Sequence, residues 1–331
     1  MEARILSVGT YVPERRMSND DLAAMVDTSD EWIVSHTGIR NRHIADESQA
    51  ASDLAVEAAT RALADASVDP DQLDLILLAT STPDYPGLPS TASIVQDRIG
   101  ASAAGAMDVV AACTGFVYAL ETARAYIVSG AAQTVMVIGS EVYSKIINWS
   151  DRNTCVLFGD GAAATVVAAA EPESGKPASG VIDSVLRSRG SGAGSLLRPC
   201  GGSREPFEAD QTPTERTKLS MDGRRVYTFA IQAIGESVNL LLERNGLTIN
   251  DIDHFVPHQA NIRIIEAACK RAKFPLEKFF TNIDEYANTS AASIPIALKD
   301  MIDGEKLKRG DMVVTVGFGG GLTYGANLIR W

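Results

Sequence analysis

The run LDLILLAT, residues 73–80, is the stretch that decides the fold class. Its apolar residues are nearly continuous, which is typical of a parallel strand that is buried on both faces of a sheet. Three further runs share this character: TVMVIGS at residues 134–140, residues 253–257 and residues 312–316. Amphipathic or small-residue helices are predicted between such runs, for example at residues 52–64 and 226–245. Because strands and helices alternate along the whole chain, the sequence predicts an α/β fold.

The order of these elements repeats at a period of roughly 175–180 residues, about half the chain. The turn DQLD before LILLAT has a counterpart in NDID before HFVPHQ, MDVVAACTG has one in DEYANTSAA, and TVMVIGSE has one in MVVTVGFGG. The repeat predicts a duplicated fold with two halves, residues 1–172 and 173–331, related by a pseudo-twofold axis. In this alignment Cys113 and Asn288 fall at equivalent positions. We therefore expect a site between the halves.

Composition and charge exclude several classes of protein. The 331 residues include 42 acidic and 30 basic side chains, so the formal net charge is −12, whereas a nucleic-acid binder needs a basic field. The longest nearly apolar stretch, residues 161–170, is far shorter than the roughly 18 residues of a membrane span. The start, MEARILSVGTYVP, lacks the apolar region of a signal peptide. We expect neither nucleic acid nor a membrane as a partner.

The cysteines predict a reducing compartment. Four of them are scattered without a CxxC pair or a histidine at metal-ligand spacing: Cys113, Cys155, Cys200 and Cys269. This usage favours a cytoplasmic enzyme with free thiols and no bound metal.

Cys113 lies in MDVVAACTGFVYAL, residues 107–120, where a strand-like run passes through small residues into a helix. A thiol at such a turn faces the helix N-terminus, whose dipole and free N–H groups favour the thiolate and lower the pKa. This predicts a nucleophile. A small buried core residue is the alternative interpretation, and it applies to the other three cysteines as well.

His258 and Asn288 are the other two candidates for chemistry. His258 follows a strand in VPHQANIRI, residues 256–264, at the predicted start of a helix whose dipole would keep the imidazole neutral. Asn288 lies among small residues in YANTSAAS, residues 286–293, where its amide is a neutral hydrogen-bond donor. Either residue can instead cap a helix. The run GFGGGLTYG, residues 317–325, offers unobstructed backbone N–H groups for an oxyanion hole, or a tight turn.

Together, these motifs and TSDEWIVSHTGIRNRHI (residues 28–44) resemble those of β-ketoacyl-acyl-carrier-protein synthase III, a family with the thiolase-like fold. The resemblance extends from about residue 3 to residue 331. It implies a duplicated fold with α-β-α-β-α layers. It also implies a decarboxylative Claisen condensation of an acyl-CoA with malonyl-acyl-carrier protein, the initiation of fatty acid biosynthesis. The family needs no cofactor, because acyl-CoA is a substrate, and it forms homodimers.

The resemblance assigns roles to individual residues. Cys113 is the acyl-accepting nucleophile, His258 and Asn288 bind the malonyl thioester carbonyl, and the N–H groups of Cys113 and Gly320 form the oxyanion hole. Further residues correspond to CoA contacts: Trp32, Arg152, Gly223, Tyr227 and Asn261. The acyl pocket corresponds to Leu88 and Phe318. The basic residues Arg263, Lys270 and Arg271 share one helix, which predicts docking of the acidic carrier protein.

Three positions depart from the family pattern. His36 stands where arginine is usual, Ala287 replaces the glycine before the asparagine, and Leu88 replaces an aromatic residue. The starter acyl group is therefore open: acetyl, or another short or branched acyl chain.

Other classes of protein share parts of this pattern. A papain-like hydrolase has Cys, His and Asn in the same order, and His258 lies 145 residues after Cys113, within the papain range. The CGSCW-type signature of that family is absent from the sequence. An HMG-CoA synthase-like condenser would need a glutamate base, and the quoted motifs place none at the site. A related acyltransferase of secondary metabolism stays open, whereas a non-catalytic scaffold would not need the three polar residues.

Overall fold

The computed structural model describes residues 1–172, 175, 178–207 and 215–331, and the chain forms two mixed β-sheets. The first sheet has the order β1 (Glu2–Tyr11), β7 (Gly161–Ala170), β6 (Thr134–Glu141), β4 (Leu75–Ala79) and β5 (Gly105–Val109). The second has the order β8 (Gly180–Ser188), β13 (Thr323–Arg330), β12 (Met312–Gly319) and β11 (His254–Pro257). The four strands predicted from apolar runs are thus confirmed as β4, β6, β11 and β12.

The two sheets repeat one pairing pattern. In the first, β4 pairs in parallel with β6, and β7 pairs antiparallel with β6 and β1. In the second, β11 pairs in parallel with β12, and β13 pairs antiparallel with β12 and β8. The counterpart of β5 is reduced to a single parallel bridge between Phe255 and Phe279. Since β6 begins at Thr134 and β12 at Met312, the offset is 178 residues, within the predicted period.

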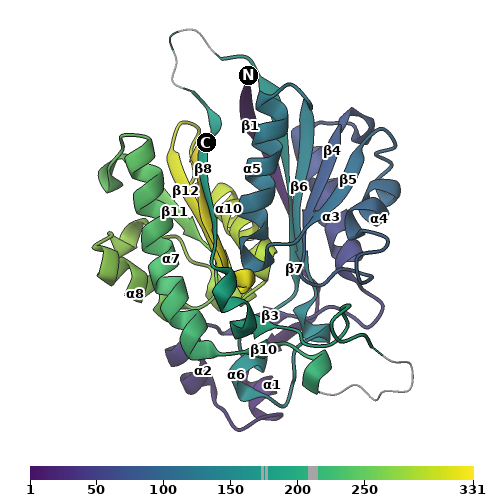
Figure 1. Cartoon of the computed structure of the whole chain (residues 1–331), viewed down its shortest axis with the longest axis vertical. Helices are drawn as coiled ribbons and strands as arrows, with labels where there is room; N and C mark the ends of the chain where they lie inside the picture. Colours follow the sequence, from purple (N-terminus) through teal and green to yellow (C-terminus); the bar gives the residue numbers. More distant parts are fainter. Residues whose placement is uncertain (173–174, 176–177, 208–214) are drawn as a thin grey trace.

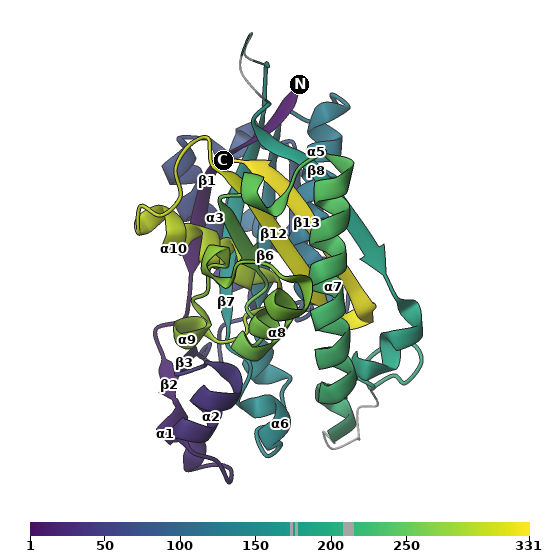
Figure 2. The same ribbon diagram turned by 90° about the vertical axis from the view of Figure 1, so that its left-hand side faces the viewer.

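Helices form three layers around the two sheets (Figure 1). The outer face of the first sheet is covered by α3 (Ala51–Ala66) and α4 (Thr91–Arg98). The outer face of the second sheet is covered by α7 (Gly223–Arg244) and α8 (Ile262–Ala272), and Figure 2 shows α7 running beside β13. Between the sheets lie α5 (Gly115–Val128) and α10 (Ser293–Asp303). The predicted α-β-α-β-α layers are confirmed.

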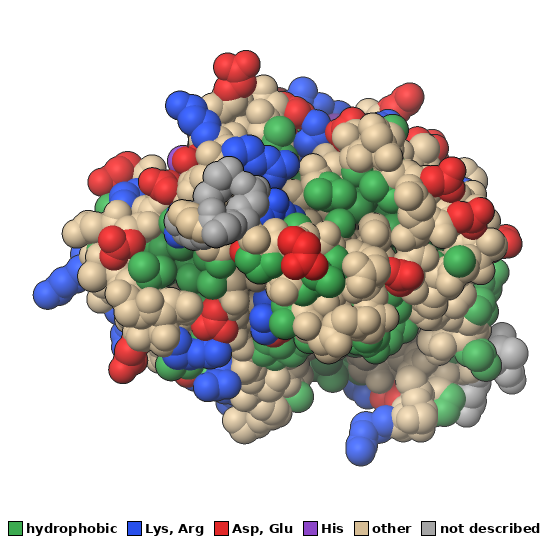
Figure 3. Space-filling view, turned by 90° about the horizontal axis from the view of Figure 1, so that it is seen from above, with side chains coloured by type: hydrophobic (Ala, Val, Ile, Leu, Met, Phe, Trp, Pro, Cys, Tyr) green, Lys and Arg blue, Asp and Glu red, His purple; other side chains and the backbone are tan. Residues whose placement is uncertain are grey.

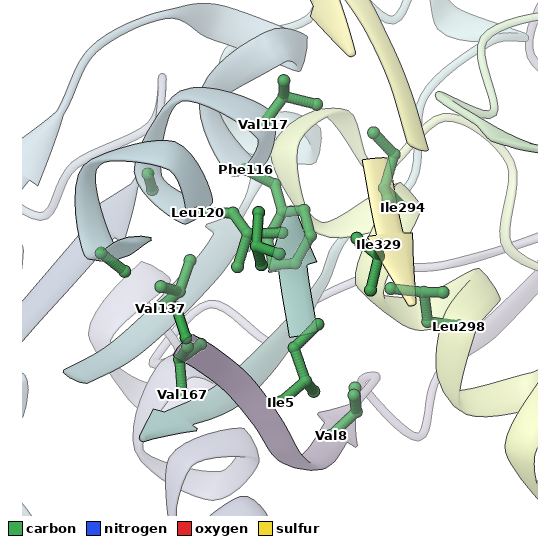
Figure 4. Close-up of a cluster of buried hydrophobic side chains, with 14 of the residues drawn as sticks. Ile5, Val8, Phe116, Val117, Leu120, Val137, Val167, Ile294, Leu298 and Ile329 are labelled. Atoms are coloured by element: carbon green, nitrogen blue, oxygen red, sulfur yellow. The ribbon is translucent and has the colours of Figure 1, made fainter. Parts of the chain in front are cut away.

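The central layer holds the largest hydrophobic cluster, part of which is drawn in Figure 4. Along β4, Leu75 and Leu77 face this layer, whereas Ile76 and Leu78 face the outer helices. The continuous apolar run of β4 therefore packs into two hydrophobic cores, one on each face of the sheet. Full burial of each such side chain contributes about 1.5–3 kcal/mol.

Shorter elements form a cap at the end of the sheets that is lowest in Figure 1. Its elements are β2 (Arg16–Ser18), α1 (Asn19–Ala23), α2 (Asp30–Thr37), β3 (Asn41–His43), α6 (Arg152–Cys155), β9 (Leu196–Leu197), β10 (Ser220–Met221) and α9 (Ile283–Tyr286). The fully buried Arg42 fastens the cap, because its guanidinium donates to Asn19 Oδ1 (2.8 Å) and to the Val156 carbonyl (3.1 Å). Burial lowers the pKa of Arg42 to about 10, so the side chain stays cationic at neutral pH.

Short 3-10 helices complete the chain. They are η1 (Pro70–Gln72), η2 (Ala112–Thr114), η3 (Tyr143–Lys145), η4 (Gly190–Ser195), η5 (Glu215–Thr217), η6 (Ile249–Asp251), η7 (Leu276–Lys278), η8 (Ser290–Ala292) and η9 (Gly320–Leu322). No described helix is long and apolar enough to cross a membrane. Basic and acidic side chains are interspersed on the face seen in Figure 3. The predicted boundary between the halves adjoins residues 173–174, which lie outside the described residues, and stays a prediction.

The two halves approach one another at two glycines. A Cβ on Gly139 of β6 would lie 2.4 Å from the Ala291 carbonyl oxygen of η8. A Cβ on Gly317 of β12, 178 residues later, would lie 3.0 Å from Cα of Thr114 in η2. Each central strand thus presses a glycine against the short helix of the other half.

We expect Gly139→Ala to lower the free energy of unfolding by about 1–3 kcal/mol, since backbone atoms must move to admit the methyl group. Denaturant unfolding measures this change. Gly190→Ala is the matched control, because a Cβ there meets nothing within 4 Å, and its effect should stay within about 0.5 kcal/mol. Equal stability of the two variants would contradict the close approach of the halves.

Candidate active site

One cavity of about 220 Å³ brings the three predicted catalytic residues together. It is lined by Cys113 from the first half and by His258 and Asn288 from the second, so it lies between the halves as predicted. The same cavity is lined by these further predicted residues: Trp32, Arg152, Gly223, Tyr227, Asn261 and Phe318. It extends from the buried thiol to the cap.

Cys113 lies in η2, one turn ahead of α5, as the sequence predicts. The preceding residue, Ala112, has a φ of +47°, which turns the chain from β5 towards the helix. A Cβ on Gly319 would lie 2.8 Å from the Cys113 nitrogen, so only glycine lets β12 end against this backbone. Gly320 follows it and lies against Ala112 and Leu196. Two backbone segments therefore meet beside Sγ, although the role of the Gly320 N–H stays a prediction.

The predicted lowering of the thiol pKa is wrong for the resting protein. Cys113 is only 4% exposed, and burial raises the pKa of its thiol to about 12. A hydrogen bond from the Ser290 side chain acts in the opposite direction and does not offset the loss of water. A charge in a dry site is costly, and the start of α5 does not replace the lost solvation. The thiol is therefore protonated until a substrate arrives.

His258 is neutral for a different reason from the predicted one. It does not begin a helix, because α8 starts at Ile262 with Asn261 as its N-cap. Instead His258 is 1% exposed, and burial lowers its pKa to about 3. Its ring packs edge-to-face on Phe318, with centroids 5.1 Å apart.

Hydrogen bonds to Ser293 favour one tautomer of His258. The Ser293 hydroxyl lies 2.7 Å from Nδ1 of His258 and accepts the N–H of Gln259 at 3.3 Å. Its single proton can then be donated to Nδ1, which places the imidazole proton on Nε2. The cavity is thereby offered a neutral N–H donor.

Asn288 is 6% exposed and both of its predicted uses are compatible with its contacts. Its Oδ1 accepts the backbone N–H of Ser290 at 2.9 Å, a local capping contact. Its backbone pairs with the 157–159 segment, donating to the Leu157 carbonyl and accepting from Gly159. With Oδ1 occupied, the Nδ2 amide is the group left to face the cavity.

The predicted equivalence of Cys113 and Asn288 is corrected by the short helices. Because η2 begins at Ala112 and η8 at Ser290, the counterpart of Cys113 is Ala291, and Asn288 lies three residues earlier. Both helices begin on a residue with positive φ, +47° at Ala112 and +50° at Ser290. The alignment by sequence pattern was therefore shifted in this segment.

At the mouth of the cavity, Trp32 already has two neighbours. The Arg152 guanidinium lies 4.8 Å from the centre of the indole, and the His36 ring stacks on it with centroids 4.4 Å apart. Arg152 also donates to the Asp27 carbonyl at 2.8 Å. The gap between Arg152 and Trp32 is too narrow for an adenine ring, so the guanidinium must move before a nucleotide can stack there. Asn261 connects the start of α8 with α2 at the mouth, because its side-chain amide donates to the His36 carbonyl at 3.0 Å.

Some predicted residues lie outside this cavity. Leu88 is 88% exposed and does not line it, so within one chain Leu88 has no contact with the acyl site. The predicted docking residues, Arg263, Lys270 and Arg271, are exposed on α8. Arg263 flanks the mouth, since its neighbours Asn261 and Ile264 line the cavity.

Sequence reasoning missed a polar cluster behind Cys113. It consists of Glu141 at the end of β6, Tyr143, and Ser290 from the quoted NTSAAS motif. Ser290 belongs to the run of small residues after Asn288, as does Ser293, whose hydroxyl instead contacts His258. Glu141 ends the run TVMVIGSE, and an acidic residue at the end of a buried strand was the signal that could have identified it.

Comparisons with known proteins identify the family of the chain. Family models described as 3-oxoacyl-[acyl-carrier-protein (ACP)] synthase III and its C-terminal part match residues 107–190 and 242–331. The β-ketoacyl-[acyl-carrier-protein] synthase III of Caldanaerobacter subterraneus subsp. tengcongensis is 49% identical over 329 residues, 99% of this chain and 98% of that protein.

Two solved structures share the fold. The synthase III of Thermus thermophilus is 44% identical, with a TM-score of 0.90 and 99% of each chain covered. The priming β-ketosynthase of the R1128 polyketide pathway is 34% identical, with a TM-score of 0.90, covering 99% of this chain and 96% of that one. With nearly half of its residues identical to a relative over almost its whole length, the chain belongs to the β-ketoacyl-[acyl-carrier-protein] synthase III family of acyltransferases.

Proposed function

We propose that this enzyme condenses an acyl-CoA starter with malonyl-acyl-carrier protein, giving a β-ketoacyl-carrier protein, CoA and CO₂. The observation that carries the proposal is the cavity itself, in which a buried thiol faces two neutral hydrogen-bond donors. The names of the family and of its relatives support a β-ketoacyl-carrier protein as the product. In this role the enzyme initiates fatty acid biosynthesis.

Acylation is the first half of the reaction. Sγ of Cys113 attacks the thioester carbonyl of the acyl-CoA, and the oxyanion is held by the N–H groups of Cys113 and Gly320. The CoA thiolate then leaves through the mouth, where Trp32, Arg152 and Asn261 bind its nucleotide and pantetheine parts. Gly223 and Tyr227 line the same exit.

Condensation is the second half. The malonyl thioester oxygen accepts hydrogen bonds from Nε2 of His258 and Nδ2 of Asn288, which stabilise the enolate that forms as CO₂ leaves. The enolate carbon attacks the acyl carbonyl on Cys113 and releases the thiolate. Both donors are neutral, and burial keeps the pKa of His258 so low that the imidazole cannot supply a proton that would quench the carbanion.

The reaction needs no group besides the chain and its two substrates. Every bond made or broken belongs to a thioester, a thiol or a carboxylate, so we propose that no metal or redox cofactor takes part. We also propose a cytoplasmic location, because the nucleophile must remain a free thiol and the cytoplasm keeps thiols reduced. All four cysteines are free and buried.

A homodimer is proposed from the free edge of the first sheet. The outer edge of β5 has no neighbouring strand among the described residues, and unpaired strand edges tend to bind another strand. Large exposed apolar side chains lie on β5 and just after it, Met107 and Val110, and on the adjoining loop 83–90, Tyr85 and Leu88. A second copy related by a twofold axis would cover them. The predicted acyl-pocket role of Leu88 requires such a partner.

A related condensing enzyme of secondary metabolism is the second candidate. The R1128 priming ketosynthase, which belongs to a polyketide pathway, shares the fold at 34% identity, and this similarity supports the second candidate. The two candidates differ in the starter acyl group. Intact-mass analysis of the protein after exposure to a panel of acyl-CoAs identifies the group that Cys113 accepts.

We expect His258→Ala and Asn288→Ala each to lower the condensation rate about 10²–10³-fold, because each removes a donor to the enolate. Acylation of Cys113 by acyl-CoA should persist in both variants. Intact mass measures acylation, and CO₂ release with product formation measures condensation. Cys113→Ala is the control that should carry no acyl group. An acyl adduct in that variant would remove Cys113 from its role.

Arg263→Glu should lower kcat/KM for malonyl-carrier protein about tenfold through weaker association, as expected for a charge at the rim of an interface. Acylation of Cys113 by acyl-CoA should be unaffected. Lys308→Glu is the matched control: Lys308 is exposed beside Gly310, whose N–H donates to the C-terminal Trp331. Loss of both half-reactions in Arg263→Glu, or an equal effect of Lys308→Glu, would refute docking at α8.

Val110→Asp should convert a homodimer into monomers, since it places a charge beside the β5 edge on each copy. Light scattering after size exclusion measures the mass. Val128→Asp at the end of α5 is the control, because Val128 is also exposed but belongs to another element. A wild-type monomer would contradict the proposed assembly.

A further inference from the structure

A buried carboxylate lies behind Cys113, outside the cavity. Glu141 ends β6 and is completely buried. Its Oε2 accepts the Thr82 hydroxyl at 2.7 Å and the Ser81 N–H at 3.0 Å. It does not line the cavity, so it does not touch a bound substrate there. The condensation mechanism described above assigns it no role.

The Ser290 side chain connects this carboxylate to the nucleophile. It lies within reach of both groups, since its hydroxyl lowers the pKa of the Cys113 thiol and that of the Glu141 carboxylate. Ser290 is completely buried, and its backbone N–H is held by Asn288 Oδ1 at 2.9 Å. The Tyr143 hydroxyl donates a hydrogen bond to Ser290 Oγ, with the two oxygens 3.4 Å apart. A thiol, a hydroxyl and a carboxylate thus lie together in a dry interior.

In the part of the chain that the structure describes, Glu141 has no cationic partner. Among the described residues no Lys or Arg forms an ion pair with it, and burial raises its pKa to about 7 although its hydrogen bonds act in the opposite direction. A structural carboxylate in such a site is normally paired with a cation. An unpaired one that titrates near neutrality can take up and release a proton.

The other titratable groups around the cluster are committed elsewhere. Asp84 accepts from Ser52, and Asp160 accepts from Ser144 and Ala45. The ammonium group of Lys145 donates to the carbonyls of Glu47 and Gln49. Burial raises the pKa of Tyr143 well above its usual range, so the phenol stays protonated. Glu141 is therefore the group next to Ser290 that can accept a proton at neutral pH.

We propose that Glu141 stores the Cys113 proton, receiving it through the Ser290 hydroxyl during acylation and returning it after condensation. The inference rests on the proposed acyl transfer to Cys113. In acylation the Sγ–H proton passes to Ser290 Oγ as the serine proton passes to Glu141. Sγ then bonds to the acyl carbon, and the departing CoA thiolate takes a proton from solvent.

Condensation reverses the transfer. The enolate carbon forms its bond to the acyl carbon, the C–S bond breaks, and the Cys113 thiolate regains the proton of Glu141 through Ser290. One proton is thus consumed in each cycle, by CoA, which balances the loss of the malonyl carboxylate as CO₂. Throughout the life of the acyl-enzyme Glu141 is neutral, so the malonyl carboxylate and the enolate meet no buried anion behind Cys113.

Glu141→Gln and Ser290→Ala test the two links separately. Each should slow single-turnover acylation by acyl-CoA about 10²-fold at pH 7, as expected from the loss of a proton acceptor. In the wild type the acylation rate should rise with pH through an ionisation near neutrality, and both variants should lose that dependence. Rapid quenching followed by intact mass measures the rate. Glu121→Gln on α5 and the buried Ser237→Ala on α7 are matched controls.

The sign of the effect separates proton storage from a purely electrostatic role. The negative charge of Glu141 raises the pKa of the Cys113 thiol, so removing that charge alone would accelerate acylation. Faster acylation in Glu141→Gln, or unchanged rates and pH profiles in both variants, would overturn the proposal.

Infrared difference spectra of the wild type give a test that does not depend on a folded variant. Forming the acyl-enzyme should produce the C=O band of a protonated carboxylic acid, which shifts in D₂O whereas the new thioester band does not. The absence of that band on an enzyme that is fully acylated by mass would refute the proposal. A wild type that takes up no acyl group would instead contradict the proposed function, and the storage role would fall with it.

Discussion

The site depends on one constraint: the two halves of the chain meet with backbone against backbone. Gly139 and Gly317 stand at matching places in β6 and β12, and each lies against the short helix of the opposite half. Gly319 extends the same contact to the Cys113 nitrogen. A side chain at any of these positions would separate η2 from the end of β12 or η8 from β6. The thiol, the imidazole and the amide would then no longer share one cavity.

Because the two halves are in such close contact, the site is shielded from water, and this burial determines which of its groups can carry a charge. Cys113, His258 and Asn288 are almost completely buried, so any charge on them is costly. The same burial raises the pKa of the thiol and lowers that of the imidazole, and it leaves three neutral groups around the substrate. Neutral donors in a dry site interact strongly with an enolate that appears only in the reaction. The cost is that the nucleophile rests as a thiol and needs a place for its proton.

Sequence patterns predicted the layers, the four buried strands, the period of the repeat and the three residues that meet in the cavity. These features depend on local composition and order, which a single chain displays. The pKa values could not be predicted in the same way, because they depend on burial by segments far apart in sequence. His258 was expected to owe its neutrality to a helix terminus, yet α8 begins four residues later. Leu88 was placed in the acyl pocket, although within one chain it is exposed to solvent.

The duplication also places a residue of the second half, Ser290, beside the nucleophile of the first half. Ala112 and Ser290 begin η2 and η8, and both adopt a positive φ that turns the chain into the short helix. In the first half this position carries only a methyl group, and the next residue is the nucleophile. In the second half it carries a hydroxyl, which reaches across to that nucleophile and to Glu141, while the residue after it is Ala291. Two copies of one turn have thus diverged, one to carry the thiol and the other to govern its proton.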